Sequence, residues 1–137
     1  MTAPLGSALR ISVMRLSRRM RQERNEGLSA SQVAALATME RQGPLSLGEL
    51  AALERVQPPS MTRVVTGLVD AGLAERAPHP TDRRQVLVSV TEAGRQLLAA
   101  DRRRRDEWLA ERLRELPQKD LDVLRAAAPI LDRLAGT

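Results

Sequence analysis

The sequence has no cysteine, a single histidine and a single aromatic residue, and these shortages exclude several classes of function. Without cysteine, the chain cannot form a disulfide, a thiolate nucleophile or a thiol redox sensor. The lone histidine, His79, cannot supply the several ligands that a zinc site needs, and there is no glycine-rich phosphate loop. We predict no metal, no cofactor and no enzymatic activity, because the one catalytic alternative, a carboxylate pair, would need acidic residues that lie instead mostly on exposed helix faces.

Long apolar runs are also absent, and none approaches the ~20 residues that a membrane-spanning helix needs. Charged residues are interleaved through the N-terminal segment, which therefore lacks the uninterrupted apolar region of a secretory signal. With 137 residues, 42% of them hydrophobic, the chain can form one domain with an aliphatic core. We expect a soluble, cytoplasmic protein with no membrane partner.

The net charge of +5 is unevenly distributed, and every basic residue except Lys119 is an arginine. Residues 1–43 hold seven arginines and three acidic residues, a net charge of +4. Residues 44–90 hold five of each and are neutral, while residues 91–137 hold ten basic and nine acidic residues, a net charge of +1. The excess of basic residues suggests that the protein binds nucleic acid. The distribution of charge does not locate the DNA-binding segment, which must be found from local sequence patterns.

The first half of the sequence predicts three helices. Apolar residues at helical spacing indicate a helix over residues 7–24, ended by Asn25 and Gly27. The second and third helices, over residues 29–43 and 46–55, each open on a serine with Gln or Glu three residues later, which is the capping-box pattern. A short extended segment joins them at Pro44–Leu45. The third helix should turn four apolar residues inward: Leu47, Leu50, Ala51 and Leu53.

A fourth helix and a β-hairpin follow. The Pro58-Pro59 pair fits the first turn of a helix over residues 58–71, and Gly72 should end it in the left-handed conformation. Its apolar stripe comprises Met61, Val64, Val65 and Leu68. Residues 73–77 and 85–90 read as strands, the second because β-branched residues alternate along it, with a polar, basic loop between them.

The C-terminal third predicts two more helices. Thr91 should cap a long helix to about Glu115, and a last helix follows Pro117, where Pro129 should kink the helix or divide it near Arg125. Two apolar stripes on this last helix indicate burial on two sides. The expected fold is mainly α with a small β-hairpin wing (class α+β), a winged helix-turn-helix flanked by terminal helices.

The segment from about Pro44 to Val90 has the pattern of a DNA-binding unit. A B-DNA major groove about 12 Å wide admits one helix, whose N-terminal residues contact base edges. In the fourth helix, that end carries small and hydroxyl side chains followed by Arg63, which can fork a guanine or a phosphate. Arg83 and Arg84, at the hairpin tip, suit the minor groove, whose negative potential attracts arginine.

Residues 47–98, from LGELAALERV to TEAGRQLL, resemble the DNA-binding part of MarR-type bacterial regulators. Four features carry the resemblance: Leu50-Ala51, Ser60–Leu68, Gly72–Arg76 and Asp82–Val88. The last fits the family's wing pattern D-x-R-x-x-x-V, and Thr91–Gly94 then resembles its T-x-x-G helix start. The flanking helices extend the resemblance over nearly the whole chain.

The resemblance implies a homodimeric transcription regulator, expected to act as a repressor on an inverted repeat in double-stranded DNA. The first and the last two helices would interlock with a second copy, giving dimerisation segments at 1–28 and 91–137 around a winged helix-turn-helix at 29–90. Asp82 would hold an arginine in place at the wing tip. Carried over by position, the expected DNA-binding residues are Pro59, Ser60, Thr62, Arg63, Thr66, Asp82, Arg83 and Arg84.

Many members of the family release DNA on binding a small, often anionic aromatic compound, so the resemblance also implies such an effector. This chain departs from the family because it has no cysteine with which to sense oxidants and little aromatic surface to stack on a ring. The alternative function is a winged helix used as a protein-interaction module, whose basic face meets an acidic partner without specific DNA binding.

Several single residues have structural interpretations as well. Arg63 can be a solvated helix residue, and Asp82 with Arg84 can form a turn-stabilising ion pair in place of DNA contacts. We expect Arg76 to be structural, pairing near the base of the wing, and His79 to be an exposed loop residue, with a phosphate contact as the alternative.

The remaining open assignments concern the terminal helices. We expect Trp108 to pack in the core or a dimer interface rather than to carry a ligand. The arginines of the first helix can contact DNA, line an anion-binding pocket or keep the helix soluble, and the sequence does not rank these three roles.

Overall fold

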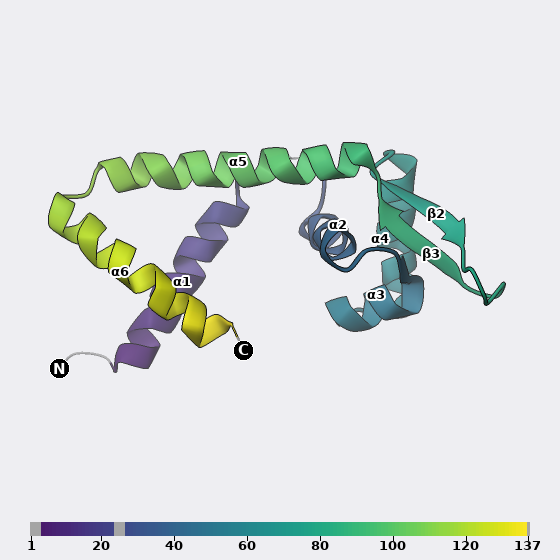
Figure 1. Ribbon diagram of the computed structural model, residues 1–137, viewed down its shortest axis with the longest axis horizontal. Coiled ribbons are helices and arrows are strands. Elements are labelled where there is room, and N and C mark those ends of the chain that lie inside the picture. The colour runs from purple at the N-terminus through teal and green to yellow at the C-terminus, as the bar shows by residue number, and fades with distance from the viewer. Residues whose placement is uncertain (1–3, 24–26, 137) are drawn as a thin grey trace. The chain divides into compact units, whose positions relative to one another are not determined.

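The computed structural model describes residues 4–23 and 27–136, and most of them are helical (Figure 1). The elements in chain order are α1 (Leu5–Arg21), α2 (Ala30–Gln42), β1 (Leu45–Ser46), α3 (Leu47–Glu54), α4 (Pro58–Asp70), β2 (Ala74–Pro78), β3 (Val86–Val90), α5 (Glu92–Arg114) and α6 (Gln118–Ala135). This order confirms the predicted class, mainly α with a small hairpin wing. The chain divides into a winged unit, Arg24–Arg102, and a terminal unit formed by Met1–Glu23 and Arg103–Thr137.

The winged unit has an aliphatic core between three helices and a sheet. The sheet is antiparallel with the strand order β1-β3-β2, so that Val88 on the central strand lies opposite Leu45 on one side and Arg76 on the other. Helices α2, α3 and α4 pack together and against this sheet. The largest fully buried apolar side chains are Leu36, Met39, Leu50, Met61, Val65, Leu68 and Val88.

Both predicted capping boxes are present. The Ser29 hydroxyl oxygen accepts from the Gln32 amide at 3.1 Å, and the Gln32 side chain accepts from the Ser29 amide at 2.9 Å. Ser46 and Glu49 exchange the same two bonds, each at 3.1 Å. Because these contacts use amides that the first helical turn leaves unpaired, they fix where α2 and α3 begin.

The turn between α3 and α4 bends sharply at Arg55, which is in the left-handed conformation with φ 55°. The amides of Arg55 and Val56 donate to carbonyl oxygens at the end of α3, a C-terminal capping arrangement usually made by glycine. Two prolines then begin α4, as predicted, and Gly72, with φ 77°, follows its end in the left-handed conformation. The turn therefore fixes the angle at which α4 leaves α3.

The prediction that Leu53 faces inward is wrong. Its side chain is 51% exposed, whereas Leu50 and Ala51 on the same helix are buried. Apolar residues occupy more than one side of α3, and a helix of eight residues that packs on one side leaves the other in water.

The junction between the wing and α5 is tightly packed. The Thr91 hydroxyl donates to the Gly72 carbonyl at 2.7 Å and accepts from the Gly94 amide at 3.2 Å, so it caps α5 as predicted. Gly94 is buried, and a Cβ at this position would overlap the Leu73 carbonyl oxygen and lie 2.6 Å from the Val90 side chain. Only glycine fits here without displacing the backbone.

The terminal unit contains α1, α6 and the last half of α5. Helix α6 crosses α1 (Figure 1), and residues of both helices line one groove. Neither helix has a buried residue. Large apolar side chains remain exposed on both, including Leu5, Ile11, Val13 and Met14 on α1 and Val123, Leu124, Ile130 and Leu134 on α6.

Two boundaries predicted for these helices are wrong. Helix α1 ends at Arg21 instead of near Arg24, and the predicted stop signal Asn25 lies outside the described residues. Helix α6 is one continuous element with Pro129 inside it, so the predicted division near Arg125 is wrong, and the alternative of a kink at Pro129 stays a prediction. A proline removes one helical hydrogen bond, and on an exposed helix water can satisfy the carbonyl group that is left unpaired.

Candidate nucleic-acid interface

The N-terminal half of α4 carries most of the residues expected to contact bases. Pro59, Thr62 and Arg63 are exposed, and Ser60 is half-buried. Gln57, the residue before the helix, makes no side-chain capping bond, and the first two helical positions are prolines. The small side chains around Arg63 therefore leave this end of α4 open to close approach by a groove wall.

Threonine hydroxyls on α4 are partly used within the helix. Thr62 donates to the Pro58 carbonyl at 3.0 Å and Thr66 donates to the Thr62 carbonyl at 2.8 Å. A hydroxyl whose hydrogen is used in this way can still accept a hydrogen bond. Thr62 thus presents an acceptor and a methyl group, features that suit an adenine or cytosine amino group and a thymine methyl group.

Arg76 connects the base of the wing to α4. Its guanidinium, on β2, donates to the Thr66 hydroxyl at 2.9 Å, across ten residues of sequence. Thr66 therefore donates within α4 and accepts from Arg76, which leaves it less available for DNA than its position suggests. Arg63 differs, because its guanidinium is exposed and makes no hydrogen bond or ion pair with any residue that the structure describes.

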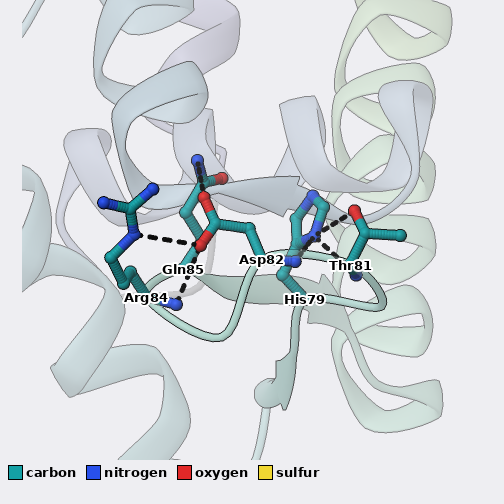
Figure 2. Close-up of polar contacts among 5 residues, drawn as sticks. All are labelled: His79, Thr81, Asp82, Arg84 and Gln85. Carbon is teal, nitrogen blue, oxygen red and sulfur yellow. Dashed lines mark hydrogen bonds and ion pairs between the residues drawn. The ribbon is translucent and has the colours of Figure 1, made fainter.

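The wing tip is organised by Asp82. Its carboxylate accepts from the Arg84 amide at 3.0 Å, from the Arg84 guanidinium at 3.4 Å and from the Gln85 side chain at 3.3 Å (Figure 2). The Arg84 side chain is 92% exposed, so the ion pair is weakly held and screened by solvent. Asp82 points into the loop in this arrangement, while Arg83 is exposed beside it.

His79, which sequence reasoning treated as an exposed loop residue, is half-buried and hydrogen-bonded. Its Nδ1 atom accepts from the amides of Thr81 and Asp82 at 3.2 and 3.0 Å, and the Thr81 hydroxyl lies 3.4 Å away (Figure 2). Its own amide donates to the Gln85 carbonyl, which closes the loop. Hydrogen bonds from a side chain to amides two and three residues ahead are typical of a turn.

Glu49 lies at the start of α3 with its carboxylate bonded to the Ser46 amide. This backbone hydrogen bond is the largest cause that lowers the pKa of Glu49 below its ordinary value. The side-chain hydrogen bond with Ser46 also lowers this pKa and His79 lowers it slightly, while desolvation raises it. The capping contact is therefore strongest when Glu49 is charged.

A second candidate site lies within the terminal unit, around Trp108. The guanidinium carbons of Arg19 and Arg112 lie 4.9 and 5.0 Å from the centre of the indole ring. A cavity of about 530 Å³ beside it is lined by Ser12, Arg15, Leu16, Arg18, Arg19, Gln22 and Trp108. The indole Nε1 is buried without a hydrogen-bond partner among the described residues. The sequence could not show that the single aromatic residue lies against the N-terminal arginines.

The described parts of the chain contain neither a cluster of metal ligands nor a membrane-spanning helix. Within residues 4–23 and 27–136, no group of three or more His, Asp or Glu side chains is placed to hold a metal ion. None of the described helices combines the length and the apolar composition needed to cross a bilayer. The prediction that no cofactor is bound stays a prediction.

A short helix, a tight turn, a projecting helix and a two-stranded wing define a winged helix-turn-helix protein. The sequence profile of the MarR family matches residues 28–86. An uncharacterised HTH-type transcriptional regulator of Mycobacterium bovis is 52% identical over 130 residues, which cover 94% of this chain and 91% of that protein. The chain belongs to the MarR family and is a transcriptional regulator of that type.

Solved structures agree with this assignment. A Pseudomonas aeruginosa protein described as a transcriptional regulator superposes with a TM-score of 0.83 and 32% identity, covering 97% of this chain and 94% of that chain. A mutant of MepR from Staphylococcus aureus, solved bound to an oligodeoxyribonucleotide, has a TM-score of 0.74 at 17% identity and covers 97% and 99%. At 17% identity, the similarity to MepR shows only that the two proteins share a fold.

Proposed function

We propose that the protein is a cytoplasmic repressor that binds an inverted repeat in double-stranded DNA as a homodimer. The observation that carries this proposal is the exposed Arg63 among small side chains at the open end of α4, on a helix that Arg76 ties to the wing. In this proposal Pro59, Ser60, Thr62 and Arg63 approach the major groove, with Thr66 behind them. Arg83 and Arg84 follow the minor groove, and Asp82 orders the tip.

The homodimer is supported by the apolar surface of the terminal unit. Leu5 is 74% exposed, Leu134 is 70% exposed and Val123 is 65% exposed, and soluble monomers rarely expose large apolar patches. A second copy of the chain would cover these side chains with equivalent ones. A two-fold dimer presents two copies of α4 in opposite orientations, which accounts for a preference for inverted repeats.

An effector would fit the cavity beside Trp108. The cavity volume of about 530 Å³ is in the range of small-molecule sites, and the lining contains Arg15, Arg18 and Arg19. The indole Nε1 is buried and has no hydrogen-bond partner among the described residues. The guanidinium of Arg19 already pairs with Glu23 at 3.2 Å, but the arginines of the lining together favour a small anionic compound, which we propose as the class of effector.

Selection of bound sequences from random DNA tests the proposed function. Recovery of an inverted repeat, with half-sites about one helical turn apart, would support both the specificity and the two-fold dimer. The affinity for the recovered site should fall steeply with salt, by about 0.9 in the log–log slope for each neutralised phosphate. Failure to enrich any sequence, together with capture of an acidic protein by the same surface, would favour a protein-interaction module instead.

A further inference from the structure

The wing tip depends on a single histidine that the DNA-contact assignments leave without a role. Two backbone amides, those of Thr81 and Asp82, donate to the Nδ1 atom of His79 (Figure 2). An imidazole nitrogen can accept only if it carries no proton, so both bonds require the neutral ring with its hydrogen on Nε2. A second proton on the ring would turn the acceptor into a donor that faces two amide hydrogens.

The same loop links His79 to the arginine at the tip. The Asp82 amide is held by His79, and the Asp82 carboxylate accepts from both the amide and the guanidinium of Arg84. The His79 amide closes the loop on Gln85. The imidazole thus holds the Asp82 backbone, and the Asp82 carboxylate holds the Arg84 backbone at 3.0 Å, so the imidazole acts on the loop that carries the Arg84 side chain.

We propose that His79 is a positioning residue for DNA binding, and that its protonation disorders the wing tip and weakens binding in mildly acidic conditions. This proposal rests on the proposed DNA-binding function. Histidine is the side chain that changes charge between pH 5 and 8. The ordered tip therefore requires the neutral imidazole, and a second proton on the ring would remove both hydrogen bonds.

Charged groups around the imidazole act in both directions. Asp82 and Arg84 belong to the same loop and Arg83 lies between them, while Glu49 on α3 interacts with His79 through space. The carboxylates favour a charged ring and the arginines oppose it. A charged ring would also attract DNA phosphates, which is the effect opposite to the one proposed. The direction of the pH dependence therefore decides between positioning and direct phosphate contact.

The test compares wild type with His79→Asn and His79→Gln in the full chain, using the recovered operator as the probe. The Asn side-chain oxygen can accept from amides two residues ahead, as Nδ1 does, but does not titrate. The longer Gln side chain places its amide near the position of Nε2, so it should not replace Nδ1 as the acceptor. At pH 7.5, we expect Asn to bind like wild type and Gln to bind about fivefold more weakly, the equivalent of one average hydrogen bond.

Acidification to pH 5.5 should then weaken wild type by about fivefold relative to His79→Asn. Because His79 is the only histidine, the Asn variant corrects for every other pH effect on the protein or the DNA. Equal pH profiles for wild type and His79→Asn, or tighter binding by wild type at pH 5.5, would overturn the proposal.

A measurement on the free protein separates this proposal from the proposed function. NMR of the imidazole nitrogens should show hydrogen on Nε2 alone at pH 7.5, and the amides of Thr81 and Asp82 should be protected from hydrogen exchange. Protection should fall at pH 5.5 in wild type and persist in His79→Asn, after correction for intrinsic exchange rates. Unprotected amides at pH 7.5 would refute the role of His79 whether or not the protein binds DNA.

Discussion

The winged unit and the terminal unit bury their apolar residues to very different extents. In the winged unit, Leu36, Leu50, Val65 and Leu68 are fully buried. In the terminal unit, α1 and α6 contain many apolar residues and bury none of them fully. The comparison teaches that one part of the chain completes its own core, whereas the other leaves an apolar surface exposed, which the proposed second copy would cover.

The largest expected effect comes from a cavity in the winged unit. Leu68→Ala should lower the free energy of unfolding by about 2–5 kcal/mol, because the side chain is fully buried. Leu53→Ala makes the same chemical change at a side chain that is 51% exposed, and it should have little effect. Urea unfolding followed by circular dichroism measures both, and equal losses would contradict the core described for this unit.

Glutamates introduced into the apolar surface of the terminal unit should weaken the association of two copies of the chain. The double variant Val123→Glu with Leu134→Glu should weaken the proposed dimer at least about tenfold, since it buries charge in an apolar interface. Analytical ultracentrifugation over a concentration series measures this change. Leu53→Glu is the matched control in the winged unit and should leave the mass unchanged. A wild-type chain that is monomeric at all concentrations would refute the dimer.

The next effect concerns specificity. Arg63→Ala should cost about 1–3 kcal/mol in affinity for the operator if the guanidinium forks a base. Arg103→Ala removes an exposed arginine of α5 and tests the general loss of positive charge. Fluorescence anisotropy at fixed salt with operator and scrambled DNA compares the two. If Arg63→Ala weakens both DNAs equally, the residue contacts phosphate and carries no base specificity.

The smallest effect is the pH dependence of the α3 capping box. The pKa of Glu49 is lowered in the folded chain, so its contribution to stability is present above the ordinary value of 4.5 and is lost as the pH falls through the lowered value. Glu49→Gln keeps the capping bond without titrating. Urea unfolding from pH 7 to pH 3 measures the stability of both proteins. As the pH falls, the wild type should lose stability relative to Glu49→Gln. A constant difference would show that the charge has no effect.

Sequence alone predicted those features that depend on neighbours in the chain. Both capping boxes, the left-handed Gly72 and the two wing strands follow from residues within a few positions of one another. Leu53 was misassigned because helical periodicity does not show which of two apolar sides is covered. The fold class was predictable because few folds are compatible with all of these local signals together.

The candidate site was predictable only in outline. Whether the eight expected residues contact DNA stays a prediction, although all of them lie on α4 or at the wing tip. The bond from Arg76 to Thr66 and the stacking of Trp108 on Arg19 join residues that are distant in sequence, and nothing in either local pattern specifies the partner. The role of His79 was missed because an imidazole serving as an acceptor leaves no composition or charge signal.

The packing at Gly94 has a consequence for protein engineering. Thr91 and Gly94 hold the first turn of α5 against Gly72 and Leu73, immediately before β2. A chimera that exchanges DNA-binding units therefore cannot be joined after Val90 without also replacing this contact surface. Arg102 bonds to Glu40 on α2 at 3.0 Å, so the transferable module extends through that arginine. A chimera joined after Arg102 keeps both contacts within one parent, and this makes residue 102 the natural place to recombine relatives with different operators.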